Sequence, residues 1–152
     1  MEKTVILGVL IFIFGCSKQH NKTHVKFNDI SQRGYSQSIE VNPRHFKTIY
    51  ISGQVPVNPD GKLVGYNNLG LQTEQVFKNI KSQVEKAGGT MDDIVNLDCY
   101  FTDISKIGKF RTARDKFINL KNPPASTAVE INRLINKDFM IEINAVAVIK
   151  YN

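Results

Sequence analysis

One carboxylate stands out among the residues that could do acid–base chemistry. Glu142 lies inside the apolar run FMIEINAVAVIK, residues 139–150, which has the composition of a strand in the interior of a sheet. Carboxylates are rarely buried without a partner or a task, and burial raises their pKa toward the range that suits proton transfer. The sequence therefore makes Glu142 the candidate acid–base residue. The alternative is an edge position where Glu142 faces water.

Other residue types that build catalytic sites are poorly placed. The three histidines are His20, His24 and His45, so no Ser–His or Cys–His arrangement is expected. His20 and His24 have a spacing that could hold a metal on a helix, but they fall in a polar, flexible segment. No GxGxxG or P-loop spacing occurs. We predict no metal and no cofactor, and we expect Cys99, on the apolar face of a strand, to be a buried structural thiol.

Strands and helices are expected to alternate in the region that positions Glu142. Residues 46–53 predict a strand, 55–65 a turn, and 67–89 a helix with apolar residues at helical spacing. Residues 95–101 predict a half-buried strand, followed by a second helix that Asp103 can cap. Two prolines precede a strand that ends near residue 134, and residues 139–149 form the last strand. The expected order is β-β-α-β-α-β-β.

The length and composition of the chain suit one globular domain. It has 152 residues, of which 41% are hydrophobic and 22% charged. With only two helices predicted, one sheet face lacks cover, although residues 145–149 are apolar on both sides. We infer that a second subunit covers this face. The net charge of +6 is spread over scattered lysines without an aromatic–basic stripe, so nucleic acid is not a predicted partner.

The first residues resemble an export signal. The apolar run of residues 5–14 is too short to span a bilayer and suits the hydrophobic region of a signal peptide. Gly15 and Cys16 resemble a bacterial lipobox, in which the cysteine becomes the lipidated first residue. We expect a signal peptide over residues 1–15, lipidated Cys16 with a flexible tether over 16–32, and the domain over 33–152. The protein would then be a lipoprotein of the cell envelope, facing away from the cytoplasm. An ordinary cleaved signal and an uncleaved anchor are the alternatives.

Four stretches resemble one known family. These are ISGQVPVNPDGKLVG, QTEQVFKNIKSQVEKAGGTMDDIVNLDCYFTDI, NPPASTAVEI and MIEINAVAV, which stand in the family's order between residues 35 and 150. They resemble the Rid family of reactive-intermediate deaminases, also called YjgF-like or L-PSP proteins. The resemblance implies a chorismate-mutase-like α/β fold, with a mixed sheet and two helices on one face. It also implies a homotrimer with ligand pockets between subunits.

The resemblance also implies an activity and site residues. Well-studied members hydrolyse small imines and enamines, such as 2-aminoacrylate, to 2-oxo acids and ammonia without a cofactor. Glu142 stands at the acidic residue that positions or activates water, and Tyr35 in RGYSQS at the pocket tyrosine. Ser52 and Gly53 match the Ser-Gly-Gln turn at the pocket wall.

Ser126 departs from the family pattern. The family holds the substrate carboxylate with an arginine in a Pro-Ala-Arg sequence, and this chain has Pro124, Ala125 and Ser126 there. Losing a bidentate charged contact costs about 2–3 kcal/mol of binding. Three explanations of the missing arginine are open. In the first, the substrate has no carboxylate group to hold. In the second, Arg111, which stands where members often carry asparagine, supplies the cation instead. In the third, the site has kept only ligand binding. Ala128 stands where some members have a cysteine.

The function predicted from the sequence is water addition to a C=N bond of a small imine or enamine, with Glu142 as the acid–base residue. The alternative is a non-catalytic small-molecule binding or regulatory module that uses the same pocket. An endoribonuclease ranks last because the chain lacks an acid–base histidine pair. The predicted partners are an imine, an enamine or a 2-oxo-acid-like ligand, further copies of the chain, and a membrane reached through the lipid anchor alone.

Overall fold

A computed structural model describes residues 24–30, 32, 36–42 and 45–150. The predictions for the signal peptide, for Cys16 and for Tyr35 lie outside the described residues. No helix of the described part is both long and apolar enough to cross a bilayer.

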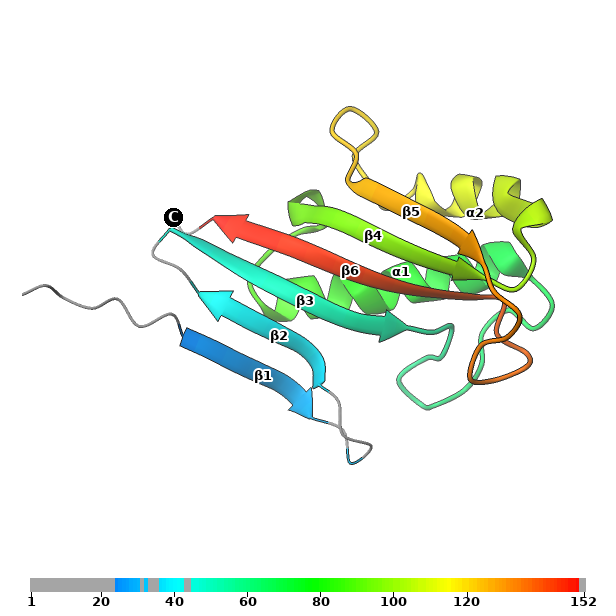
Figure 1. Ribbon diagram of the computed structural model, residues 1–152, viewed down its shortest axis with the longest axis horizontal. Coiled ribbons are helices and arrows are strands. Elements are labelled where there is room, and N and C mark those ends of the chain that lie inside the picture. The colour runs from blue at the N-terminus through cyan, green and yellow to red at the C-terminus, as the bar shows by residue number, and fades with distance from the viewer. Residues whose placement is uncertain (1–23, 31, 33–35, 43–44, 151–152) are drawn as a thin grey trace, which may run out of the picture.

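A single mixed sheet forms the body of the protein (Figure 1). Its six strands lie in the order β1-β2-β3-β6-β4-β5. All neighbouring strands are antiparallel except β4 and β5, which are parallel and are joined through helix α2. The strands are β1 (His24–Ile30), β2 (Ser36–Asn42), β3 (Phe46–Gln54), β4 (Ile94–Phe101), β5 (Ala125–Glu130) and β6 (Ile141–Lys150); the α-helices are α1 (Leu69–Lys86) and α2 (Ile107–Arg114).

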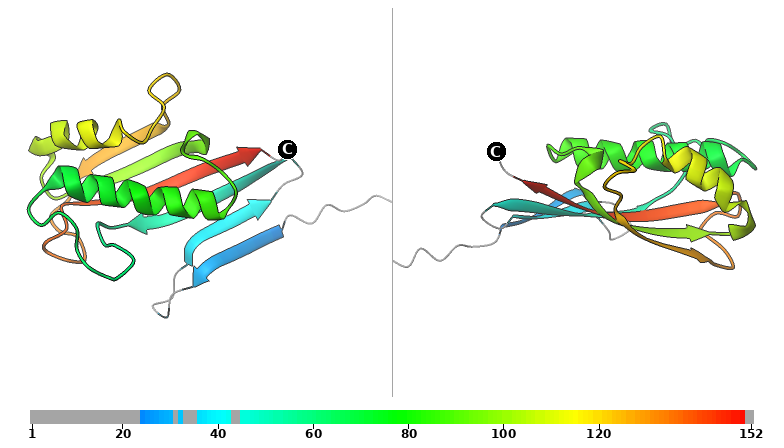
Figure 2. Two further views of the ribbon diagram at one scale, coloured as in Figure 1. Left: turned by 180° about the vertical axis from the view of Figure 1, so that it is seen from behind. Right: turned by 90° about the horizontal axis from the view of Figure 1, so that it is seen from above.

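Both α-helices lie on the same side of the sheet (Figure 2). We call this side the helix face and the other the open face. Helix α1 begins where the Asn68 side chain accepts a hydrogen bond from the Leu71 amide, and its apolar stripe of Val76, Phe77, Ile80 and Val84 packs on the sheet. The predicted mixed sheet with two helices on one face is confirmed.

The central strand β6 has two different faces. Alternate residues from Ile141 to Ile149 are buried against the helices, whereas Glu142, Asn144, Val146 and Val148 lie half-buried on the open face. The sequence suggested a strand covered on both sides. In one chain the helices cover only one side, so the other side remains partly accessible.

Three details differ from the sequence-based expectation. Residues 24–30, expected within the tether, form β1, so the folded domain begins before residue 33. Val95, expected on the buried face of its strand, is exposed because the β4–β6 register shifts between Ile94 and Asn96. The strand after the two prolines ends at Glu130, short of residue 134.

The β1–β2 hairpin is held to the rest of the domain by polar contacts. Glu40 of β2 is 5 % exposed and accepts a hydrogen bond of 2.9 Å from Asn28 Nδ2. Lys47 Nζ lies 3.4 Å from the Glu40 carboxylate and donates to the Ala87 carbonyl at 2.9 Å, which links the hairpin to the end of α1. Burial by itself would raise the pKa of Glu40, but the Asn28 hydrogen bond and the charges of Lys47 and Lys26 hold it below its usual range.

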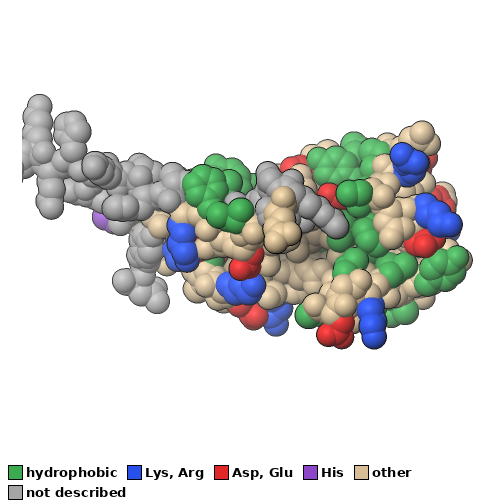
Figure 3. All heavy atoms as spheres, turned by 90° about the horizontal axis from the view of Figure 1, so that it is seen from below, with side chains coloured by type: hydrophobic (Ala, Val, Ile, Leu, Met, Phe, Trp, Pro, Cys, Tyr) green, Lys and Arg blue, Asp and Glu red, His purple; other side chains and the backbone are tan. Residues whose placement is uncertain are grey.

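Charged side chains on the side of the molecule drawn in Figure 3 are mixed in sign. Lys and Arg side chains lie between Asp and Glu side chains there, without a continuous basic stripe. Several lysines are paired, including Lys26 with Glu40 and Lys86 with Asp29.

Candidate functional site

Glu142 lies on the open face of the central strand. Its strand, β6, runs between β3 and β4, so the edge position left open by the sequence does not apply. The side chain is half-buried, and burial raises the pKa of its carboxyl above the ordinary glutamate value. A half-buried carboxylate with a raised pKa is a stronger proton acceptor than an exposed one.

Gly53 lies directly against the Glu142 carboxylate. A Cβ at Gly53 would stand 2.0 Å from Glu142 Oε1, so only glycine leaves room for the carboxylate in its present place. The β3–β6 register shifts between Ile51 and Gln54, so Ser52 and Gly53 lie in an irregular stretch opposite Asn144, and Gly53 reaches the Glu142 side chain two residues along β6. The structure therefore brings together three of the predicted site residues.

A hollow of about 400 Å³ lies next to this point on the open face. Ser52 and Gly53 line it, together with Asp98 of β4 and Asn144 of β6. Tyr100 of β4 is the cross-strand partner of Glu142, which sets its side chain beside the carboxylate. The sequence analysis missed Asp98, Asn144 and Tyr100 as site residues. The alternation in NLDCYF, which buries Cys99, could have placed Asp98 and Tyr100 on the other face.

Ser126 lies on the opposite side of the sheet. It is the register partner of Leu97, which faces the helices, and its Oγ lies 4.0 Å from Sγ of Cys99. Ala128, the partner of Cys99, shares this face. Because β5 is an edge strand, Ser126 and Ala128 are exposed. The sheet therefore separates Ser126 and Ala128 from Glu142 within one chain.

Cys99 is buried, as the sequence predicts, with 1 % of its surface exposed. Burial raises the pKa of its thiol to about 11, and the contact with Ser126 opposes this rise. The negative charge of Asp98 also raises the pKa, whereas the positive charge of Arg114 lowers it. A thiol with this pKa is protonated near neutral pH and is a poor nucleophile. This environment suits a structural residue.

Two arginines of α2 differ in their relation to Ser126. Arg111, the cation suggested by the sequence, is exposed. Arg114 is close enough to lower the pKa of the Cys99 thiol, and this thiol contacts Ser126. The Arg114 guanidinium is also partly buried, lies 5.5 Å from the Phe110 ring centre, and pairs with Asp115 at 2.8 Å. Arg114 is therefore the better-placed cation on this side, and sequence reasoning missed it.

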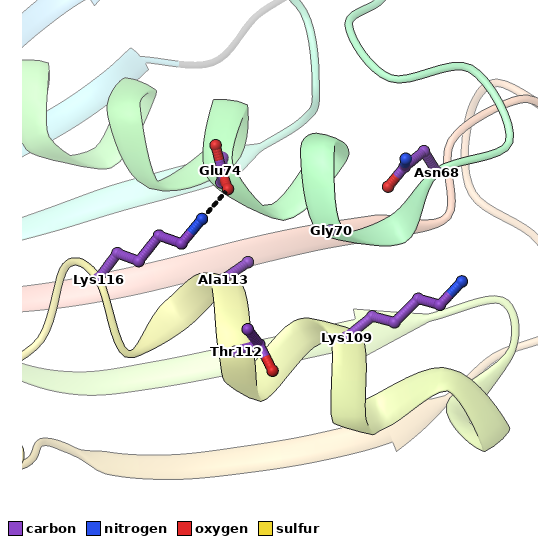
Figure 4. Close-up of a pocket in the computed structure, with 7 residues that line it drawn as sticks. All are labelled: Asn68, Gly70, Glu74, Lys109, Thr112, Ala113 and Lys116. Carbon is purple, nitrogen blue, oxygen red and sulfur yellow. Dashed lines mark hydrogen bonds and ion pairs between the residues drawn. The ribbon is translucent and has the colours of Figure 1, made fainter.

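A second groove lies between the two α-helices (Figure 4). Its volume is about 300 Å³, and an ion pair of 2.6 Å between Lys116 and Glu74 crosses it. It is lined by none of the residues that the sequence singled out. Among the described residues, no group of three or more His, Cys, Asp or Glu side chains is gathered as a metal site.

Comparison with known proteins identifies the family of the chain. The family model described as Endoribonuclease L-PSP matches residues 28–149. The chain belongs to this L-PSP family, also called Rid or YjgF. A RutC family protein of Saccharolobus solfataricus is 38% identical over 113 residues, which cover 74% of this chain and 85% of that protein. A putative regulator AldR of Lactococcus lactis is 36% identical over 103 residues, covering 67% and 79%.

The fold agrees with solved structures of Rid proteins. The crystal structure of RidA from the Antarctic bacterium Psychrobacter sp. PAMC 21119 matches with a TM-score of 0.67 and 33% identity. The match covers 76% of this chain and 88% of that one. The family resemblance inferred from the sequence is confirmed.

The close contact between Gly53 and Glu142 generates a prediction about Gly53→Ala. The new methyl group displaces the far end of a flexible side chain, so the free energy of unfolding should fall by no more than about 1–3 kcal/mol. The displaced carboxylate gains water, and its pKa should return toward the ordinary glutamate value, as measured by NMR titration of the carboxyl carbon. Gly108→Ala, where a Cβ meets nothing within 4 Å, is the control. An unchanged Glu142 pKa in Gly53→Ala would contradict the contact.

Proposed function

We propose that this Rid-family protein binds a small metabolite between the subunits of a homotrimer and adds water to its C=N bond, with Glu142 as the acid–base residue. The observation that carries the proposal is the carboxylate held half-buried on a central strand, with a raised pKa, against a residue that has no side chain. Ser52, Gly53 and Tyr100 surround it. These are the surroundings of a proton-transfer group.

The separation of the two groups of site residues supports a pocket between subunits. Glu142 and Gly53 belong to the open face and Ser126 to the helix face, so a pocket that uses all three needs a second copy. The open face also has apolar side chains that a second copy could cover, including Ile39, Tyr50, Val146 and Val148. Burial of such surface contributes about 25 cal/mol per Å² to association.

The proposed reaction is hydrolysis. The Glu142 carboxylate takes a proton from water as the water oxygen bonds to the imine carbon, and it passes this proton to the imine nitrogen to give the amino alcohol. Glu142 then takes the hydroxyl proton as the carbonyl forms and delivers it to the departing nitrogen, which leaves as ammonia. An enamine enters the same sequence after protonation at carbon. One water is consumed and one ammonia released, and no oxidant or metal is required.

The alternative is a binding or regulatory module. Serine at position 126 favours it, because a site without the family arginine has lost its charged fork for a carboxylate. The Lactococcus relative is named a putative regulator. The description of the family model also contains the word endoribonuclease. We rank this activity last because no histidine that could serve in an acid–base pair for RNA cleavage occurs between residues 46 and 150.

The pocket between subunits requires an oligomer in solution. Light scattering on residues 17–152 should give about three times the mass of one chain, because the open face gains cover only by association. Replacing Tyr50, which is 52% exposed on the open face, with Glu should shift the protein toward monomers. A wild-type monomer at micromolar concentration would contradict the proposed pocket.

Ammonia release from freshly generated substrates tests the chemistry. Wild type should act weakly on 2-iminopropanoate, and Ser126→Arg should raise kcat/KM by about 30- to 150-fold, equivalent to about 2–3 kcal/mol. Glu142→Gln should abolish turnover of any imine. Saturable binding without turnover on both charged and neutral imines would favour the binding module.

Two arginine variants are the controls for this experiment. If a cation on α2 already holds the carboxylate, Arg114→Gln should raise KM for 2-iminopropanoate but leave a neutral imine unaffected. Arg111→Asn should do the same if Arg111 is the cation. Full wild-type activity on imino acids that survives both substitutions would contradict our account of Ser126.

We also propose that the protein is anchored through Cys16. The support is the sequence alone, in which an apolar run ends at Gly15 and Cys16 and a polar segment follows. Cys16→Ser should move the protein from the membrane fraction to a soluble or unprocessed form. A wild-type protein that fractionates as soluble would contradict the anchor.

A further inference from the structure

Gln72 is a fully buried polar side chain that links three segments of the chain. It lies in the first turns of α1 and is 0 % exposed. Its Nε2 donates to the carbonyl oxygens of Gly65 at 3.2 Å and Asp138 at 2.8 Å, and its Oε1 accepts from the Met140 amide at 2.7 Å. One amide thus satisfies backbone groups of the loop before α1 and of the loop before β6.

The loop before α1 is fixed tightly at this point. Gly65 has a φ of +78°, and a Cβ there would stand 2.6 Å from Leu71 Cβ. The loop backbone therefore packs directly on the first turn of α1, where Gln72 reaches it. The carbonyl of Gly65 is a fixed point from which Gln72 can hold the second loop.

Met140 is the last residue before β6 and is held from two sides. Its amide donates to Gln72, and its carbonyl accepts from the Thr102 amide at 3.2 Å. Strand β6 starts at the next residue, and Glu142 follows. The position of Met140 therefore acts on the Glu142 backbone together with the β4–β6 ladder, in which Tyr100 pairs with Glu142.

Glu142 needs such support because the β3 ladder ends one residue short of it. The last β3–β6 pair is Gln54 with Ile143, after an irregular stretch opposite Asn144. The Glu142 backbone is therefore paired with Tyr100 of β4 on its other side. The tolerance is small, since the Gly53 backbone leaves no room for a Cβ beside the carboxylate. A shift of a few tenths of an ångström at the start of β6 would alter this contact.

We propose that Gln72 is the positioning residue for Glu142, which it holds against Gly53 by fixing the backbone at Met140. The proposal rests on the proposed function only for its effect on catalysis. The effect on the placement of Glu142 can be measured without any substrate. The two can therefore fail separately.

The first test compares two matched substitutions in α1. Gln72→Met keeps the volume and removes all three hydrogen bonds. Gln75→Met is the control, because Gln75 is also buried but bonds to Asn79 at 2.8 Å, away from β6. In Gln72→Met the NMR-measured pKa of Glu142 should fall toward that of an exposed glutamate, because water reaches the displaced carboxylate. Asp98 and Tyr100 of β4, which face the same side, are unchanged in both variants.

The catalytic readout follows the same direction. Activity that needs the Glu142 carboxylate is lost as the pH falls through its pKa, so the acid limb of the pH profile should move to lower pH in Gln72→Met. We expect kcat to fall about 10- to 100-fold with KM changed by less than about twofold. Gln75→Met should keep the wild-type limb and kcat. A folded Gln72→Met with the wild-type Glu142 pKa would overturn the proposal, whether or not any imine is hydrolysed.

Wild-type protein gives a test that needs no substitution, in case Gln72→Met does not fold. The Met140 amide should exchange with solvent as slowly as amides in the middle of β6, because it donates a 2.7 Å hydrogen bond to the buried Gln72 side chain. Exchange as fast as at a frayed strand end would overturn the proposal. Slow exchange at Met140 supports the anchor at the point where it acts on β6.

Discussion

The burial of one carboxylate in a central strand is the constraint on which the arrangement of the site depends. Taking Glu142 out of water disfavours its charged form, and the rest of the strand is apolar and tightly packed. The fold accommodates this group by omitting a side chain at Gly53, which lies in an irregular stretch of β3. A half-buried carboxylate there lacks the apolar contacts that a hydrophobic side chain would make, and its pKa is raised instead.

The helix face supplies the rigidity that this arrangement needs. Its core joins α1 to β6 through Val76, Ile80 and Val84, and a cluster of Phe77, Phe101, Phe110 and Phe117 joins α1, α2 and β4. Buried amides complete the connection where apolar packing ends. Asn79 donates to the Val55 and Val57 carbonyls at 3.0 Å, as Gln72 does for the neighbouring loops. Helix α1 thus orders the loops at the end of the sheet that carries Glu142.

Periodic apolar residues allowed the sequence to predict α1, β3, β4 and β6, because burial of one face leaves a clear spacing in each. The β1–β2 hairpin was missed because its helix-facing residues include Lys26, Asn28 and Glu40, which form a polar network rather than an apolar stripe. Glu142 was found as a charge inside an apolar run. The alternation in NLDCYF gives the face of Asp98 and Tyr100 but not their neighbour across the strands, and the bonds of Gln72 to distant loops leave no mark on the local pattern.

The proposed chemistry depends on assembly because its residues lie on two faces of the sheet. In one chain Glu142 is half-buried, and the residue at the family's arginine position lies on the other side of the sheet. A subunit that covers the open face would remove more water from Glu142 and raise its pKa further, toward neutral pH. The same subunit would bring its own copies of Ser126 and Arg114 to the open face, where Gly53 and Tyr100, rather than a cation, lie against Glu142. Association would then couple the proton-transfer group to whatever binds the substrate, so that a lone chain holds each half of the site without the other.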